Sequence, residues 1–223
     1  MTEPVSRKTT TLADSLFERL CEAVVEGQLP AGTKISEPEL ARTYRVSRGP
    51  LREAISRLEA CGLVTRRANV GARVVSLSAR ELIEIFRVRE ALEGMAARLA
   101  AENMTDTEVS AMRELLERHR TEVAEDEGQA YFQKQGDLDF HYRIVQASRN
   151  RRLVSLLCDD LYHLVRMYRY QFGMPSTRGP VALNEHAQIV EAMADRDGEL
   201  AELLMRRHIR ASRRNVERML EQG

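Results

Sequence analysis

The first apolar pattern along the chain is typical of an amphipathic helix. Apolar side chains recur at four-residue steps, at Leu12, Leu16, Leu20 and Val24. This spacing places them on one face of a helix over residues 11–25. Gly27 and Pro30 then interrupt the pattern and predict the end of that helix.

Two shorter helices are predicted next, joined by a tight turn. In the first, Ser36 can act as the N-cap and Glu39 can complete a capping box. The second begins after an N-cap Ser47 and ends at Gly62. Its buried face is formed by Leu51, Ala54, Ile55 and Leu58. Two helices separated by residues 45–47 have the helix-turn-helix arrangement, in which the second helix lies in the DNA major groove.

A β-hairpin is predicted after the third helix. Residues 63–67 and 72–75 are rich in β-branched side chains, and the turn between them ends at Gly71. Glycine permits a positive φ or a close backbone approach at that position. The hairpin and the three helices together predict a winged helix-turn-helix domain over residues 11–77, preceded by a flexible N-terminus over residues 1–10.

From Ser78 onward the pattern is that of helices alone. The β-branched alternation disappears, and turn signals divide the remainder into six predicted helices. These helices cover residues 79–103, 106–126, 129–148, 151–172, 180–195 and 198–221. The predicted fold class is therefore mainly α: a winged helix-turn-helix with a small β-hairpin wing, followed over residues 78–223 by an antiparallel six-helix bundle.

Composition adds an uneven charge distribution to this picture. The 223 residues carry no formal net charge. Residues 42–73, however, contain eight arginines and only two acidic residues, Glu53 and Glu59. A positive region of this kind attracts phosphates, although a solvated basic face would have the same composition.

Composition also bears on the compartment and on the cysteines. The sequence contains no apolar stretch typical of a membrane span or a secretory signal, so we expect a cytoplasmic protein without a membrane partner. Cys21, Cys61 and Cys158 are widely spaced among apolar neighbours. We expect them to be buried thiols rather than disulfides or zinc ligands.

Several arginines in the basic region are placed to contact DNA. Arg48 and Arg52 share one face near the start of the third helix, where the helix dipole also favours a phosphate. Arginine can bind either guanine or phosphate, and the sequence leaves that choice open. Glu53 and Arg57 are expected instead to form an i,i+4 ion pair that supports the helix. Further cations lie on the predicted wing, at Arg66, Arg67 and Arg73.

Four polar residues occupy predicted core-facing positions of the helical bundle. They are Asp137 and His141, which are one helical turn apart, His186 and His208. Three histidines and an aspartate on the buried faces of different helices suggest a divalent-metal site, since imidazole and carboxylate suit zinc, nickel or manganese. Separately satisfied core histidines are the alternative, because the spacing does not show which helices pair.

The residues around the third helix resemble the winged helix of the GntR family of transcription regulators, in the run VSRGPLREAISRLEACGLVTRRANVGARVV. The shared core is SR-x-P-x-REA-x-x-x-LE-x-x-G-L. By this resemblance the positions that contact DNA are Ser47, Arg48, Gly49, Pro50 and Arg52, and Gly71 lies at the wing tip. Gly49 replaces the Thr or Ser common in the family, so a hydroxyl contact is absent and a different preferred operator is allowed.

The helical half is similar to the FCD-type effector domain of the FadR subfamily, in its shorter VanR-like branch. The similar motifs are DLDFH at 137–141, EH at 185–186 and RRHI at 206–209. The resemblance implies a divalent metal, with zinc favoured, and open positions for water or an effector carboxylate. The implied metal ligands are Asp137, His141, His186 and His208. It also implies a homodimer and an effector cavity faced by Arg89, for which an Arg89–Glu93 helical pair is the alternative.

Together these features predict a sequence-specific transcription regulator, with repression the favoured outcome, that binds double-stranded operator DNA and responds to a small carboxylate metabolite. Two alternatives remain: a metal-dependent hydrolase, and a DNA-binding protein whose helical domain only dimerises. The hydrolase is the weaker alternative because the sequence contains no HExxH, P-loop or nucleophile-elbow motif. We therefore expect no enzymatic activity.

Overall fold

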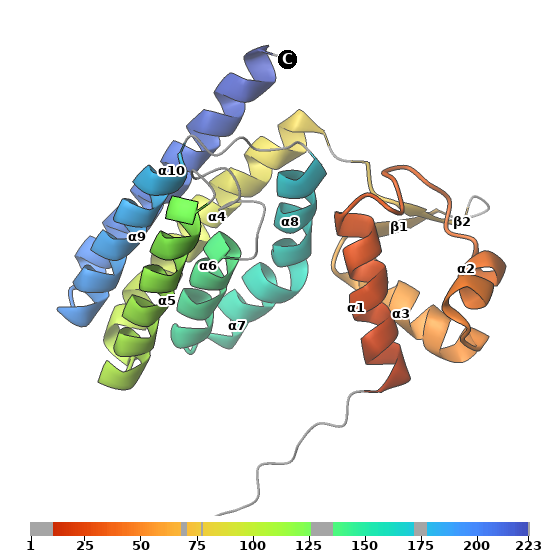
Figure 1. Ribbon diagram of the computed structural model, residues 1–223, viewed down its shortest axis with the longest axis horizontal. Coiled ribbons are helices and arrows are strands. Elements are labelled where there is room, and N and C mark those ends of the chain that lie inside the picture. The colour runs from red at the N-terminus through yellow and green to blue at the C-terminus, as the bar shows by residue number, and fades with distance from the viewer. Residues whose placement is uncertain (1–10, 68–70, 77, 126–135, 172–177, 223) are drawn as a thin grey trace, which may run out of the picture. The chain divides into compact units, whose positions relative to one another are not determined.

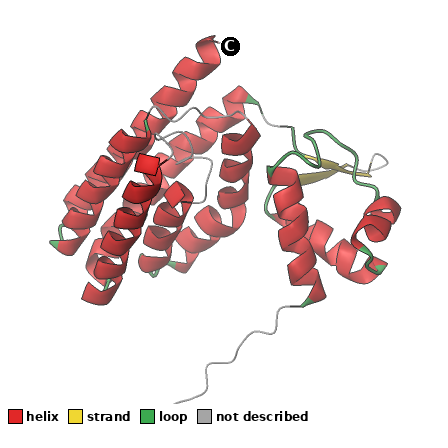
Figure 2. Cartoon of the chain, in the orientation of Figure 1, coloured by secondary structure: helices red, strands yellow, loops and turns green. Residues whose placement is uncertain are grey.

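The computed structural model describes residues 11–67, 71–76, 78–125, 136–171 and 178–222. The chain divides into two compact units, Met1–Ser76 and Leu77–Gly223. Figure 1 labels the helices and strands of both units. Within the described residues, strands occur only in the first unit (Figure 2), and the second unit is helical.

The first unit combines helices with a two-stranded hairpin. Its elements are α1 (Leu12–Val25), α2 (Glu37–Tyr44), α3 (Arg48–Ala60), β1 (Val64–Arg67) and β2 (Gly71–Val74). Helix α1 packs on α3. The apolar residues with the lowest exposure in this unit include Leu16, Leu20, Leu51, Ile55 and Leu58. The predicted winged helix-turn-helix fold is confirmed.

The turn between α2 and α3 depends on a left-handed residue. Arg45 has a φ of +54°, and its N–H donates to the Ala41 and Arg42 carbonyls at the end of α2. Ser36 and Ser47 occupy the predicted N-cap positions, but neither side chain makes a capping hydrogen bond within the described residues. The capping box expected at Ser36 is therefore wrong, because the Ser36 hydroxyl accepts no hydrogen bond from the first turn of α2.

The two wing strands pair antiparallel, from Val64 opposite Val74 to Arg67 opposite Gly71. Gly71 has a φ of +91°, a conformation that other L-residues rarely adopt. The Ile35 N–H donates to the Ala72 carbonyl and so joins the segment before α2 to the edge of β2. Residues 68–70 of the predicted turn lie outside the described residues.

The second unit is helical throughout its described part. Its elements are α4 (Ala79–Asn103), α5 (Asp106–Glu125), α6 (Gly136–Ala147), α7 (Arg151–Val154), the π-helix η1 (Ser155–Leu161), α8 (Tyr162–Gln171), α9 (Gly179–Ala194) and α10 (Gly198–Gln222). The predicted helical bundle is confirmed.

Helix α4 is the centre of the second unit, because α6, α9 and α10 all pack against it (Figure 1). Small residues on its buried face, among them Ala97, Ala100 and Ala101, allow this close packing. A Cβ at Gly94 would lie 2.6 Å from Cγ of Arg206, so glycine is required for α10 to approach at that point.

Two predicted helices differ in detail from the structure. The run predicted as one helix over residues 151–172 contains the π-helix Ser155–Leu161 between α7 and α8. The i→i+5 hydrogen bonds of a π-helix change which residues share a face. The apolar pattern of the sequence does not predict that change. The helix predicted over residues 129–148 is described only from Gly136, and residues 126–135 lie outside the described residues.

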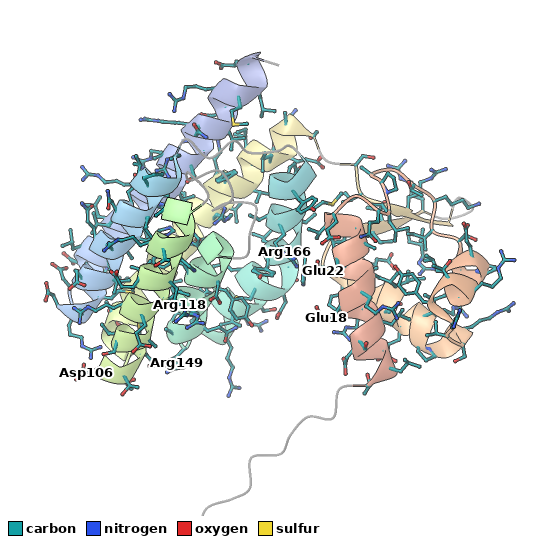
Figure 3. The ribbon with its side chains drawn as sticks, viewed as in Figure 1. Glu18, Glu22, Asp106, Arg118, Arg149 and Arg166 are labelled. Atoms are coloured by element: carbon teal, nitrogen blue, oxygen red, sulfur yellow. The ribbon has the colours of Figure 1, made fainter. Side chains whose placement is uncertain are left out.

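Charged side chains cover the outside of the helical unit and join its helix ends. Asp106 and Arg118 project from α5, and Arg149 follows α6 (Figure 3). Arg196 Nη2 donates to Asp106 Oδ1 at 2.7 Å and so ties the α9–α10 turn to α5. None of the helices in the described ranges combines the length and hydrophobicity needed to cross a lipid bilayer. The three cysteines are buried thiols outside any disulfide, as predicted.

Candidate functional sites

The start of α3 presents the residues predicted to contact DNA. Ser47, Arg48, Gly49 and Arg52 are exposed, and Pro50 is half-buried. The Arg52 side chain is 68% exposed, and its Nε lies 3.6 Å from Glu37 Oε2. Arg48 has no ion-pair partner among the described residues. Exposed ion pairs contribute little to stability, so both guanidinium groups are available to bind a phosphate or a base.

Gly49 is not required by packing. A Cβ at this position would meet nothing within 4 Å. A serine or threonine would therefore fit, and the difference from the family pattern concerns what α3 offers to DNA rather than how the unit folds.

The predicted Glu53–Arg57 pair is wrong. Arg57 Nη1 instead donates to Asp14 Oδ1 at 2.7 Å, and the guanidinium lies 4.1 Å from the centre of the Phe17 ring. Both partners belong to α1, so Arg57 joins α1 to α3. A tertiary ion pair combined with a cation–π contact replaces the local pair.

The three arginines predicted to act on the wing are not equally available. Arg66 Nε donates to Glu59 Oε2 at 3.2 Å, and Arg73 Nη1 donates to the Gly32 carbonyl at 2.8 Å. Arg67 is exposed and has no ion-pair partner among the described residues. Arg67 is therefore the wing cation that needs no rearrangement to reach a phosphate.

Three of the predicted metal ligands come together in the second unit. His141 of α6, His186 of α9 and His208 of α10 are buried, and they offer nitrogen atoms that all lie within 4.8 Å of one another. The Nε2 atoms of His186 and His208 are 3.2 Å apart. Two nitrogens each about 2.0–2.1 Å from one tetrahedral zinc ion would be about 3.4 Å apart, so this separation fits a shared ion.

The fourth predicted ligand is Asp137. Helix α6 contains Asp137 one turn before His141, but the Asp137 side chain lies outside the described residues. Phe140, which directly precedes His141 in the motif, is fully buried, and its ring stacks on the His186 ring with 3.8 Å between centroids. This stacking holds the His186 ring in place beside the cluster.

Two carboxylates orient the histidines. His141 Nδ1 lies 2.6 Å from Glu93 Oε2, and His208 Nδ1 lies 2.7 Å from Glu185 Oε2. A carboxylate that accepts the Nδ1 proton leaves the Nε2 lone pair for a metal, and it raises the basicity of the imidazole. Sequence reasoning missed both roles. The signals available were the i,i+4 spacing of Arg89 and Glu93 and the position of Glu185 beside His186, but neither shows which histidine the carboxylate meets.

Glu93 is a buried charge held by two partners. Arg89 Nε donates to Glu93 Oε1 at 2.5 Å, and both side chains are almost fully buried. Burial alone would raise the pKa of Glu93, but the Arg89 guanidinium and the His141 imidazole together lower it to about 2. The Arg89–Glu93 helical pair considered from sequence is therefore formed, and it lies beside the histidine cluster rather than at the surface.

One hydrogen-bond donor of Arg89 is unused within the described residues. Its Nη1 atom is buried and has no hydrogen-bond partner within the described residues. A buried donor without an acceptor costs about 1–3 kcal/mol, and more for a charged group. Such a group is expected where an anionic ligand completes the site.

A small cavity adjoins these side chains. Its volume is about 20 Å³, and Arg89, Glu93 and His141 form its polar wall. The π-helix η1 supplies Leu157, Cys158 and Leu161 to the opposite, mainly apolar wall. This volume holds roughly one water molecule. Burial raises the pKa of the Cys158 thiol to about 12.

Comparison with known proteins supports the family resemblance of both units. Residues 12–74 match "Bacterial regulatory proteins, gntR family", and residues 84–211 match "FCD domain". The "Probable D-xylose utilization operon transcriptional repressor" of Paenarthrobacter nicotinovorans is 32% identical over 91% of this chain and 87% of its own length. The "HTH-type transcriptional repressor RspR" of Escherichia coli is 25% identical over 100% of this chain and 93% of its own length. Among solved structures, E. coli McbR/YncC has a TM-score of 0.74 at 20% identity, covering 96% of this chain and 99% of that chain.

A winged helix-turn-helix joined to a helical domain with a buried polar site defines a two-domain transcription regulator. The chain belongs to the GntR family of bacterial transcription regulators, and its C-terminal part is an FCD domain. The relatives are regulators rather than enzymes, so the hydrolase alternative is set aside.

Proposed function

We propose that this protein is a repressor that binds operator DNA as a homodimer, and that a small carboxylate bound at a divalent metal in the FCD domain controls its affinity for the operator. The observation that carries the proposal is the convergence of three buried histidines beside Arg89, whose Nη1 donor lacks an acceptor in the described part of the chain.

The metal would be held by His141, His186 and His208, with Asp137 the fourth ligand by family resemblance. Zinc is favoured, and nickel or manganese are alternatives, because imidazole ligands suit all three ions. When bound, the ion supplies positive charge and a coordination position for a carboxylate oxygen. Glu185 lies within hydrogen-bond distance of His208 Nδ1, and Glu93 lies within ion-pair distance of His141 Nδ1. Both carboxylates therefore favour the ring orientation that leaves Nε2 for the ion.

Arg89 would bind the second oxygen of the effector carboxylate. Its Nε is engaged by Glu93, which fixes the plane of the guanidinium and leaves Nη1 directed to a further acceptor. The cavity of about 20 Å³ is too small even for a short carboxylic acid. An effector can therefore enter only if the cavity widens, and a ligand that binds the widened arrangement better shifts the population toward it.

In the winged-helix unit, the proposed DNA contacts are made by Ser47, Arg48, Gly49, Pro50 and Arg52 on α3 and by Arg66, Arg67, Gly71 and Arg73 on the wing. Arg48, Arg52 and Arg67 carry the largest part of the binding free energy, because they are exposed and only weakly held. Arg66 and Arg73 must first give up Glu59 and the Gly32 carbonyl.

The homodimer and the direction of control rest on further observations. Val88 and Met95 lie seven residues apart on α4, and their exposed fractions are 47% and 42%. Large apolar side chains two turns apart on one helix face suit contact with a second copy. Repression is favoured because relatives over most of the chain are described as repressors.

The proposal is tested by metal content and ligand binding. Wild-type protein is loaded with zinc, dialysed and assayed for bound metal, together with His186→Gln, His208→Gln and the control His163→Gln. Short mono- and dicarboxylates are then titrated calorimetrically into the loaded protein. We expect one zinc per chain in the wild type and the control, loss of zinc in the two cluster variants, and saturable heat for at least one acid. If zinc binds equally well to all four proteins, or if every acid gives no saturable heat, the proposed effector site is wrong.

A further inference from the structure

A groove runs along α9 and α10 on the far side of the histidine cluster. Its volume is about 780 Å³, within the range of small-molecule sites. Helix α9 contributes Arg178 and Glu185 to its lining, and α10 contributes Arg207, Arg210, Arg214 and Arg218. The His208 imidazole separates this groove from the proposed metal position, because its Nδ1 faces Glu185 and its Nε2 faces His186.

The arginines on α10 form one continuous stripe. Steps of three and four residues separate Arg207, Arg210, Arg214 and Arg218, so they share a helix face. Like charges at this spacing destabilise a helix by a few tenths of a kcal/mol per pair unless counter-charges offset them. The stripe therefore needs anions, either from the chain or from a ligand.

The chain supplies only part of that counter-charge. Arg210 is held by Glu90, and Glu217 of the groove is paired with Arg213 outside it. Glu221 also lines the groove, but it forms no ion pair within the described residues. Arg207 and Arg214 have no carboxylate within 4.0 Å in the ranges that the structure describes. The hydrogen bonds of Arg218 go to neutral oxygens, the Arg214 carbonyl and the Asn215 amide.

The floor of the groove is rigid. The Arg178 side chain is only 11% exposed, and its Nη2 donates to both oxygens of Glu185, at 2.8 and 2.6 Å. Its Nη1 donates to Ser212 Oγ at 3.3 Å, which ties α9 to α10. This guanidinium therefore links the two helices within the groove, whose lining also includes Arg207, Arg214 and Arg218.

We propose that this groove is a second ligand site, which binds a small molecule carrying a phosphate or pyrophosphate group. Arginine forks match the oxygens of such groups with paired hydrogen bonds, and three uncompensated guanidinium groups offset their multiple negative charge. The site is distinct from the proposed carboxylate site, which lies on the Nε2 side of His208.

Pyrophosphate is the probe for this site. It is titrated calorimetrically into the full chain at constant ionic strength, for the wild type and for the double variant Arg207→Gln/Arg214→Gln. The matched control is Arg87→Gln/Arg118→Gln, which removes the same charge from exposed positions on α4 and α5 (Figure 3 labels Arg118). We expect saturable binding to the wild type and the control, and at least about tenfold weaker binding to the groove variant.

Four outcomes overturn the proposal, and the last concerns the metal site. The first is an absence of saturable binding to the wild type, and the second is equal binding to the two double variants. The third is weaker binding of duplex DNA by the groove variant than by the control, which would make the stripe a DNA contact. Retention of pyrophosphate binding by His186→Gln is also required, because loss there would assign the heat to the metal.

Discussion

In the winged-helix unit the arginines proposed to contact DNA are exposed, whereas in the FCD domain Arg89 and the three histidines proposed to hold effector and metal are buried. The first set comes from one short helix and a hairpin that are adjacent in sequence. The second set comes from α4, α6, α9 and α10, between Arg89 and His208. Exposed charges need few partners, but buried charges are stable only when each is paired.

This contrast separates binding from stability. A change at an exposed arginine of α3 is expected to alter affinity for DNA and leave the fold unchanged. A change in the buried cluster removes a partner from a neighbouring charge, so it lowers the stability of the domain as well as its affinity for a ligand.

The largest effect is expected for Arg89→Met. It leaves the buried Glu93 carboxylate without its guanidinium partner, so we expect a loss of about 3–5 kcal/mol in the free energy of unfolding, measured by urea denaturation. The matched control is Arg80→Met, which breaks the exposed Arg80–Glu84 pair on the same helix and should cost about 0.5 kcal/mol or less. Equal destabilisation by the two variants would show that the Arg89–Glu93 pair is not a buried charge pair.

Arg52→Ala tests the opposite environment. We expect operator affinity to fall about 10- to 100-fold, because one arginine fork to a base contributes roughly 1–3 kcal/mol. The free energy of unfolding should change by less than about 0.5 kcal/mol. Fluorescence anisotropy on a duplex selected from a random library measures the affinity, with Arg87→Ala as control. Unchanged affinity would remove α3 from the role of recognition helix.

Glu185→Gln tests how far the buried site depends on residues that do not touch the metal. Loss of the carboxylate beside His208 Nδ1 is expected to weaken zinc binding about 10- to 100-fold in a competition titration with a chelator. Glu191→Gln on the same helix removes an exposed carboxylate paired with Arg113, and it should leave zinc affinity unchanged. If the two variants bind zinc alike, Glu185 does not position the imidazole.

The smallest effect is expected for Gly49→Ser. The site has room for the side chain, and serine is a better helix former than glycine, so stability should rise by a few tenths of a kcal/mol. A new hydroxyl at the start of α3 should change operator affinity by about two- to tenfold, or change the duplex selected from a library. The control Ala60→Ser adds a hydroxyl at the other end of α3. An identical affinity and an identical selected sequence would mean that position 49 does not meet DNA.

The same contrast explains what the sequence could predict. The winged helix was predictable because its helices, turn and hairpin follow local apolar spacing and glycine positions such as Gly71. The inward direction of His141, His186 and His208 was also predictable, because each lies on an apolar helix face.

The remaining features depend on contacts between distant segments. Arg57 has a local candidate partner in Glu53, yet it pairs with Asp14 on α1, because tertiary packing brings that carboxylate nearer. The roles of Glu93 and Glu185 depend on which helices lie together, and the apolar spacing does not distinguish the π-helix, in which Leu157 and Cys158 are buried, from an α-helix. Spacing along a single helix contains none of this information.

The most direct test of the account is the operator affinity of the full-length protein as a function of occupancy at the histidine cluster. Affinity for the selected duplex is measured for the metal-free, zinc-loaded, and zinc- and carboxylate-loaded protein, and again for His186→Gln. The account predicts a change of at least about fivefold on adding the carboxylate to the zinc-loaded wild type, and none in the variant. Saturable binding of the carboxylate with the same operator affinity in every state would contradict it.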